Sequence, residues 1–293
     1  MFIFLLYATT VLIWGTTWYA IKIQLGYAPH EVSIFYRDLL AALLMLTWCL
    51  IKKQSLKFSK KDHFFFFLLG TTLFSLHLLF VYSATQYLVS GIIAVVFSIV
   101  SFLTVFHNYV FFKTKPSLKT LLGICLGIFG LVLFFKKELM DVSLQDNTVK
   151  GLIIAGMGTL IFSFGSMVSR RNNEANIPVF PAMTMGMIYG TLIIGFYMIV
   201  QRIPFTFPQS YEYWMAVSYL AIPGSIVSFM CYLHLIKTIG PEKTGYSHIM
   251  FPIVALIVSS FFEGYSFSIE DGIGLMSVIF GNILVMKKKA SSS

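Results

Sequence analysis

Residues 63 to 112 read HFFFFLLGTTLFSLHLLFVYSATQYLVSGIIAVVFSIVSFLTVFHNYVFF, and this stretch decides the fold class. It contains no Asp, Glu, Lys or Arg. A helix needs roughly 20 apolar residues to cross the hydrocarbon core of a bilayer, so the stretch is too long for a single span. The polar residues 83–87 interrupt it near its middle. The sequence therefore predicts two membrane-spanning helices that meet at this point.

The composition of the whole chain agrees with this prediction. Hydrophobic residues make up 57% and charged residues 11% of the 293 residues, whereas a soluble domain carries about 25% charge. Most of the surface must therefore face lipid, which excludes a soluble domain and a disordered chain. Cys49, Cys125 and Cys231 all lie in apolar runs, and their odd number and wide spacing argue against a disulfide framework or a zinc site.

Other charge-poor runs bring the expected number of spans to ten. The runs are 1–21, a helix from near Val32 to 51, 120–135, 151–169, 175–201, 213–236, 244–262 and 272–286. The first run lacks a basic leader and a small-residue cleavage site, so we expect a retained helix rather than a signal peptide. The longest polar connection, residues 136–150, is only a loop. We therefore predict an all-α integral membrane protein with ten transmembrane helices.

Basic residues predict the orientation of these helices. With the N-terminus inside, fifteen Lys and Arg lie on the inner side and six on the outer side, which the positive-inside rule favours. The inner set is Lys52, Lys53, Lys57, Lys60, Lys61, Lys113, Lys115, Lys119, Arg170, Arg171, Lys237, Lys243, Lys287, Lys288 and Lys289, and the outer set is Lys22, Arg37, Lys136, Lys137, Lys150 and Arg202. An even number of spans places both termini in the cytoplasm.

The two halves of the chain, residues 1–140 and 150–289, match each other at a shift of about 150 residues. The matching pairs are Gly15 with Gly165, Phe111 with Phe262, Ser117 with Ser268, Gly123 with Gly274, Gly130 with Gly281, and Lys136-Lys137 with Lys287-Lys288. Each half holds five predicted helices, and an odd number means that the second half enters the membrane from the opposite side. Two inverted five-helix repeats are typical of secondary transporters, which open alternately to the two sides.

Local motifs resemble those of a known family. Residues 14–22, WGTTWYAIK, resemble the first-helix signature of the EamA family of the drug/metabolite transporter superfamily, and Arg37 resembles its second-helix arginine. Residues 252–255 and 261–265 are similar to its ninth-helix and loop motif. The chain departs from the family at Ser101, where a proline is usual, and at Thr114, where a glutamate is frequent. The resemblance implies efflux of amino acids, metabolites or drugs by proton exchange or facilitated diffusion.

Six residues are candidates for substrate binding or gating. Ionisable groups inside a membrane are costly and are functional candidates by default. The six are Trp18 of the first-helix motif, Arg37, His77, Tyr82, Tyr232 and His248. The resemblance implies that the helices of His77 and His248 line a central cavity. A structural role is the alternative for each: a tether for Arg37, interhelical hydrogen bonds for the histidines, and interfacial anchoring for the tyrosines.

Several further residues carry two readings. Pro223 and Pro252 are candidate hinges, with a passive kink as the alternative. Lys22 is either an interfacial anchor or a charge at the outer mouth. Glu263 is expected to cap a helix or fix a loop, with proton coupling as the alternative. His107 and Asn108 are expected to join helices. The GxxxG pairs at 123–127 and 186–190 are expected to pack within the monomer.

The sequence carries no P-loop, no H-E-x-x-H and no G-x-S-x-G, so we expect no ATP, no metal, no other cofactor and no catalytic residues. The expected function is secondary transport of a small organic solute (an amino acid, a metabolite or a drug), with export by alternating access. The alternatives are a membrane-embedded enzyme acting on a lipid-linked substrate and a non-transporting scaffold or receptor. Expected partners are the solute, membrane lipid and protons, without nucleic acid. We expect a monomer or a homodimer in a bacterial inner membrane.

Proton coupling has few candidate groups in this sequence. We expect too few carboxylates at mid-membrane for a carboxylate relay. A histidine or the solute itself would then carry the proton, since histidine titrates near neutral pH.

Overall fold

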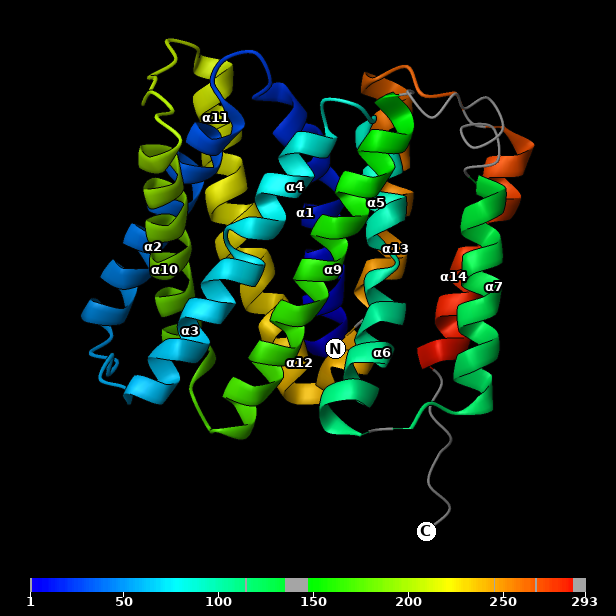
Figure 1. Cartoon of the computed structure of the whole chain (residues 1–293), viewed down its shortest axis with the longest axis horizontal. Helices are drawn as coiled ribbons and strands as arrows, with labels where there is room; N and C mark the ends of the chain where they lie inside the picture. Colours follow the sequence, from blue (N-terminus) through cyan, green and yellow to red (C-terminus); the bar gives the residue numbers. More distant parts are fainter. Residues whose placement is uncertain (1, 114, 135–146, 245, 267, 287–293) are drawn as a thin grey trace.

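The computed structural model describes residues 2–113, 115–134, 147–244, 246–266 and 268–286, and all regular structure within these ranges is helical. The helices form a bundle in which some lie in front of others, and the start of α1 and the end of α14 point to the lower end of Figure 1. The bounds are α1 Phe2–Ile23, α2 His30–Ile51, α3 Lys60–Leu73, α4 Leu76–Ala84, α5 Ser90–Phe97, α6 Val100–Phe112, α7 Leu118–Phe134, α9 Asn147–Glu174, α10 Val179–Val200, α11 Tyr211–Tyr219, η1 Leu220–Val227, α12 Ser228–Thr244, α13 Tyr246–Phe262 and α14 Ile269–Met286.

Local sequence signals set the helix ends. Pro29 and Pro178 occupy the positions just before α2 and α10. Ser59 caps α3 by accepting a hydrogen bond from the backbone N–H of Asp62, as N-terminal serines commonly do. The predicted division at residues 83–87 is confirmed, because α4 ends at Ala84 and α5 begins at Ser90.

The third span is divided into α3 and α4, and the fourth into α5 and α6. The sequence analysis did not predict these two breaks. Between α3 and α4, the hydroxyl of Ser75 donates to the carbonyl oxygens of Gly70 and Thr71 at 3.0 and 3.2 Å. Between α5 and α6, the hydroxyl of Ser98 donates to the carbonyl oxygen of Val95. In a membrane every carbonyl needs a partner, so these serines make the breaks tolerable.

The eighth span also departs from a continuous α-helix. Pro223 lies within η1, a π-helical segment between α11 and α12. Proline removes a backbone donor and leaves carbonyls unpaired. The hydroxyl of Ser228 donates to the Pro223 carbonyl at 3.0 Å, and the indole nitrogen of Trp14 donates to the Gly224 carbonyl at 3.1 Å. Pro252, by contrast, lies inside a continuous α13.

The lipid-facing surface follows the composition. Large apolar side chains such as Phe4, Leu118, Phe196 and Phe261 are exposed on the outside of the bundle. Within the described ranges, seven helical segments are long and apolar enough to cross a membrane, and the shorter apolar helices are Leu118–Phe134 and Met250–Phe262. The all-helical membrane class is therefore confirmed. The loop at 136–150 and Lys287 to Lys289 fall wholly or largely outside the described residues.

Helices α7 and α14 pack against each other at one side of the bundle (Figure 1). Glycines let their backbones approach closely. A Cβ at Gly130 would lie 2.7 Å from the carbonyl oxygen of Gly274, and a Cβ at Gly281 would lie 2.5 Å from that of Gly123. At the second GxxxG pair, a Cβ at Gly70 would lie 2.7 Å from the carbonyl oxygen of Gly186 and 2.8 Å from the backbone nitrogen of Gly190. Both predicted pairs therefore pack within the monomer.

Gly274→Ala is expected to destabilise the protein by about 1–3 kcal/mol through overpacking. Its Cβ would lie 2.6 Å from the backbone nitrogen of Phe134, and backbone cannot easily move aside. Gly156→Ala in α9 is the matched control, because no described atom beyond its own stretch of helix lies within 4 Å of its Cβ. Thermal unfolding in detergent should show a lower midpoint for Gly274→Ala alone. Equal midpoints would contradict this packing.

Candidate functional site

A small cavity lies in the interior of the bundle. Its volume is about 40 Å³, which is room for roughly two or three water molecules. It is lined by Trp14, Thr17, Trp18, Ile21, Arg37, His77, Leu78, Val81, Phe97, Phe162, Phe229 and Phe251. These side chains come from α1, α2, α4 and α5 and from α9, α12 and α13, so both halves of the chain build it.

Arg37 supplies the only formal charge among the described residues that line this cavity. It lies about two turns into α2 and is only 4% exposed. Its Nε donates to the hydroxyl of Ser225 in η1 at 3.0 Å. This hydrogen bond ties α2 to η1, so Arg37 lies inside the second span rather than at its edge.

Asp38 is buried next to Arg37 but does not line the cavity. Adjacent helical residues point in directions about 100° apart, so the two side chains diverge. The Oδ2 atom of Asp38 has no hydrogen-bond partner among the described residues. A buried carboxylate therefore lies within the second predicted span.

The cavity walls are aromatic. Phe97 and Phe162 have ring centroids 4.8 Å apart, and Trp18 lies 5.2 Å from Phe97. Trp14 meets Phe229 edge-on at 5.0 Å. Ring pairs at such distances prefer edge-to-face or offset arrangements, so the wall is a set of interlocked rings.

Three of the predicted site residues, Tyr82, Tyr232 and His248, do not line the cavity. The hydroxyl of Tyr82 donates to Oε1 of Gln24 at 2.9 Å. Tyr232 shares hydrogen bonds with Ser166 at 2.9 Å and with Nε2 of His248 at 3.2 Å. Trp18, Arg37 and His77 do line the cavity. The structure thus brings three of the six candidates together and places the other three in supporting networks.

Tyr232→Phe is expected to destabilise the protein by about 1–3 kcal/mol, because it leaves Ser166 and His248 without this buried partner. Tyr211→Phe is the control, since Tyr211 is 78% exposed. Thermal unfolding with and without solute separates the two roles of Tyr232. A lost solute response at an unchanged unfolding midpoint would contradict a supporting role and favour direct contact.

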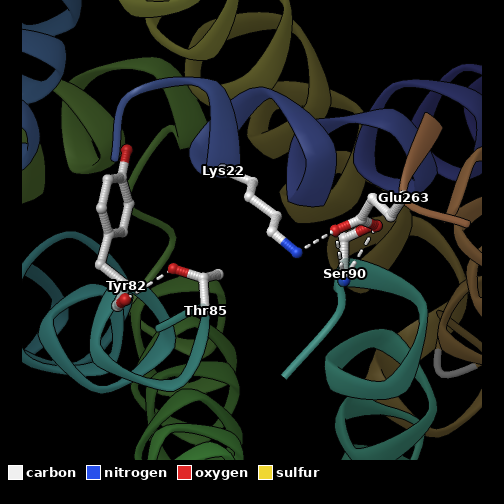
Figure 2. A network of polar contacts seen from close by, with 5 residues as sticks. All are labelled: Lys22, Tyr82, Thr85, Ser90 and Glu263. Atoms are coloured by element: carbon white, nitrogen blue, oxygen red, sulfur yellow. Dashed lines mark hydrogen bonds and ion pairs between the residues drawn. The ribbon is translucent and has the colours of Figure 1, made fainter. Parts of the chain in front are cut away.

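An ion pair joins the end of α1 to the residue that follows α13 (Figure 2). Nζ of Lys22, at the end of α1, lies 2.7 Å from Oε1 of Glu263, which follows α13. Glu263 also accepts hydrogen bonds from the backbone N–H of Ser90 at 3.1 Å and from its hydroxyl. We call these three residues the clasp. Lys22 is therefore paired rather than a free anchor, and Glu263 fixes the start of α5 as well as its own loop.

The environment of the clasp keeps Glu263 charged. Burial raises the pKa of Glu263, but hydrogen bonds from Lys22 and Ser90 and the charge of Lys22 outweigh burial, so its pKa lies below the ordinary value of 4.5. The side chain of Glu263 is 3% exposed and that of Lys22 is 33% exposed. Glu263 is thus shielded from solvent, whereas Lys22 is partly exposed to it.

A second set of contacts joins helices at the lower end. Nη1 of Arg170 donates to Oδ1 of Asn108 at 2.8 Å, and Nη1 of Arg171 lies 3.0 Å from Oδ1 of Asp62. Nδ1 of His107 lies 2.9 Å from the hydroxyl of Ser163. The predicted interhelical role of His107 and Asn108 is confirmed. The bundle therefore has a set of polar interhelical contacts toward each end.

Comparison with known proteins places this architecture in a family. The model of the EamA-like transporter family matches residues 1–136 and 149–287. The chain belongs to this family. This EamA-like protein is 26% identical over 282 residues to the "Uncharacterized inner membrane transporter YedA" of Escherichia coli K12, covering 94% of this chain and 87% of that protein. It is 25% identical to the "Uncharacterized transporter in trpA 3'region" of Buchnera aphidicola, covering 97% and 92%.

A solved crystal structure shares the fold of this EamA-like protein. The TM-score is 0.71 at 18% identity, with 96% of this chain and 94% of that chain covered. The protein is a multi-pass integral membrane transporter. The motifs at 14–22, at Arg37 and at 252–265 thus identified the family correctly from sequence.

Some residues of the site escaped the sequence reading. Trp14 carries a usable signal, because it precedes Trp18 by four residues and so shares a helix face with it. Ser90 and Ser225 carry none, since their roles depend on partners far away in the chain. The wall residues Phe97, Phe162, Phe229 and Phe251 are hidden among 30 phenylalanines.

Proposed function

We propose that this transporter moves a small organic solute, such as an amino acid, a metabolite or a drug, out of the cell by alternating access. The observation that carries the proposal is the interior cavity, which residues of both halves line and which holds one buried cation. A binding site between two halves of a membrane bundle is the usual arrangement in secondary transporters.

The packing of α7 against α14 supports two inverted repeats. The sequence match pairs Gly123 with Gly274 and Gly130 with Gly281. In the structure, each glycine of α7 contacts the repeat equivalent of the other one: Gly130 contacts Gly274, and Gly123 contacts Gly281. A two-fold axis in the membrane plane requires such an exchange. Ten spans in two halves, residues 1–140 and 150–289, are the arrangement we propose.

Other helix pairs follow the same symmetry. Helix α1 packs on α13 and α12, and α9, the first helix of the second half, packs on α6 and α4. One pair departs from it: a Cβ at Gly15 would meet Val254, whereas a Cβ at Gly165 would meet Leu73. The repeat symmetry is therefore stronger at the α7–α14 contact than at these two glycines.

The closures at the two ends support alternation. Lys22 ends the first helix of one half, and Arg170 lies near the end of the first helix of the other half. Each contacts the fourth span of the opposite half, through Glu263 and Asn108 respectively. Opening one closure while the other holds would expose the cavity to one side at a time.

The orientation we propose has both termini in the cytoplasm. The clasp then lies on the outer side, and the contacts of Arg170 and Arg171 lie on the inner side, where most of the basic residues gather. The name of the Escherichia coli relative supports an inner-membrane location. A monomer or a homodimer is compatible with this account.

Counterflow in reconstituted vesicles tests the proposal. Vesicles loaded with members of an amino-acid and metabolite panel should accumulate the same labelled solute transiently, and protein-free vesicles should not. A saturable signal would support a carrier. The absence of flux across the panel, together with turnover of membrane-lipid extracts, would overturn it in favour of the membrane-embedded enzyme.

A further inference from the structure

Tryptophan and arginine side chains supply hydrogen-bond donors to the cavity. Two tryptophans line it, and their indole N–H groups differ. Trp14 donates to the Gly224 carbonyl, whereas Nε1 of Trp18 is buried and has no partner among the described residues. An indole N–H can only donate, so this atom requires an acceptor. A buried donor left unpaired is costly, which makes Trp18 a marker for a missing ligand atom.

Arg37 adds positive charge to the same cavity. Its guanidinium group carries five N–H donors and accepts no hydrogen bond. The bond to Ser225 uses only Nε of Arg37, and Tyr82 is a further hydrogen-bonding neighbour of this guanidinium. Nδ1 of His77, another lining residue, also lacks a partner in the described part of the chain. One cation and one unpaired indole donor together favour an acceptor with negative charge, and a planar fork suits a carboxylate.

The walls favour a flat apolar group beside that charge. Rings of Trp14, Phe97, Phe162, Phe229 and Phe251 surround the polar groups. The faces and edges of these rings can pack against an aromatic ring of the solute in the preferred geometries. A flexible aliphatic chain in the solute would not gain this additional interaction energy. The present cavity of about 40 Å³ is too small for such a solute, so these rings must separate when it binds.

We propose that the transported solute is a carboxylate attached to a flat, aromatic-type body, held by Arg37 and Trp18 and enclosed by the ring walls. This proposal rests on the proposed transport function and narrows its solute class. Arg37 and Trp18 bind the carboxylate, and the phenylalanines select its body. The proposal excludes cations as preferred solutes.

Four probe molecules test the wild-type protein in detergent at neutral pH: phenylacetate, its neutral amide, phenethylamine and cyclohexylacetate. A ligand of the folded state raises the unfolding midpoint by mass action, which yields an apparent Kd. We expect phenylacetate to bind roughly tenfold or more tightly than the amide or the amine. Cyclohexylacetate should bind about two- to tenfold more weakly than phenylacetate, because it lacks a flat ring.

Two matched variants assign the donors. Trp18→Phe keeps a ring but removes the unpaired N–H, so it should weaken phenylacetate binding about three- to tenfold and leave amine binding as it is. Trp14→Phe removes an N–H that already has a partner, and the preference for phenylacetate over the amide should persist. Equal loss of that preference in both variants would overturn the role of Trp18.

The outcomes distinguish the solute class from the transport function. If the amide or the amine binds as tightly as phenylacetate, or if none of the four binds, the inferred class is wrong. Counterflow of other solutes would then leave the proposed function standing. If phenylacetate binds with the expected preference but never crosses the vesicle membrane, the binding class holds and the transport function fails.

Discussion

Arg37→Gln is expected to reduce solute counterflow by roughly 10- to 100-fold. Hydrogen bonds to a charged group contribute about 1.5–3 kcal/mol, and each 1.4 kcal/mol is a factor of ten. The guanidinium of Arg37 is buried and is the one formal charge among the described lining residues, so nothing else there can replace it. Initial rates at equal amounts of folded protein in vesicles measure the effect.

Two further variants separate charge from geometry at this position. Arg37→Lys keeps the charge but loses the planar fork, so it should retain part of the activity. Ser225→Ala removes only the hydroxyl that accepts from Nε of Arg37, and its loss should be smaller than that of Arg37→Gln. Counterflow at the wild-type rate in a folded Arg37→Gln protein would contradict the role of this cation.

Glu263→Gln is expected to open the upper mouth of the bundle. The substitution keeps the shape of the side chain but removes its negative charge. That charge attracts Lys22 and also strengthens the hydrogen bonds that Ser90 donates. A loss of about 1–3 kcal/mol in the closed state corresponds to roughly a 5- to 150-fold shift toward the open state. Labelling of a cavity cysteine by a membrane-impermeant thiol reagent measures that shift.

Thr17→Cys supplies the reporter, because Thr17 lines the cavity. The background replaces Cys49, Cys125 and Cys231 by alanine. Glu212→Gln is a matched control: Glu212 lies at the start of α11 and accepts an exposed hydrogen bond from Tyr27. Its labelling rate should stay at the background value. If Glu263→Gln labels no faster than Glu212→Gln, the clasp does not close the cavity.

The clasp should also respond to acid. The pKa of Glu263 lies below its ordinary value of 4.5 in the folded protein, so its contribution to closure is complete above that value. The contribution is lost as the pH falls through the lowered pKa, when the carboxylate takes up a proton. A thiol reacts as its thiolate, whose fraction falls with pH, so the labelling rate of the Thr17→Cys reporter is divided by that of the same reporter in Glu263→Gln at each pH. This ratio should be constant from neutral pH down to about pH 5 and rise only below it. A rise near neutral pH would contradict this assignment.

Apolar runs and their interruptions predicted the membrane class and many helix ends. Residues 83–87 separate two spans because their polar groups interrupt an otherwise apolar stretch, and α4 and α5 end and begin beside them. The breaks at Ser75 and Ser98 were not predictable in this way. Serine is common in membrane helices, and its hydroxyl can bond a carbonyl with or without breaking the helix.

The candidate site was predicted in part. A costly charge marked Arg37, and the family resemblance marked Trp18 and the helix of His77; all three line the cavity. Tyr82, Tyr232 and His248 were chosen by the same reasoning but lie behind it, because residue type does not tell which face of a helix turns inward. The pairing of Lys22 with Glu263 joins opposite ends of the chain, so it required the fold.

The most direct test of alternating access is two-sided labelling of the Thr17→Cys reporter in oriented vesicles. The impermeant thiol reagent is applied to one side or the other, in the cysteine-free background. The account predicts labelling from both sides, with solute changing the two rates in opposite directions. Labelling from one side only, with and without solute, would contradict a cavity that opens alternately to the two sides of the membrane.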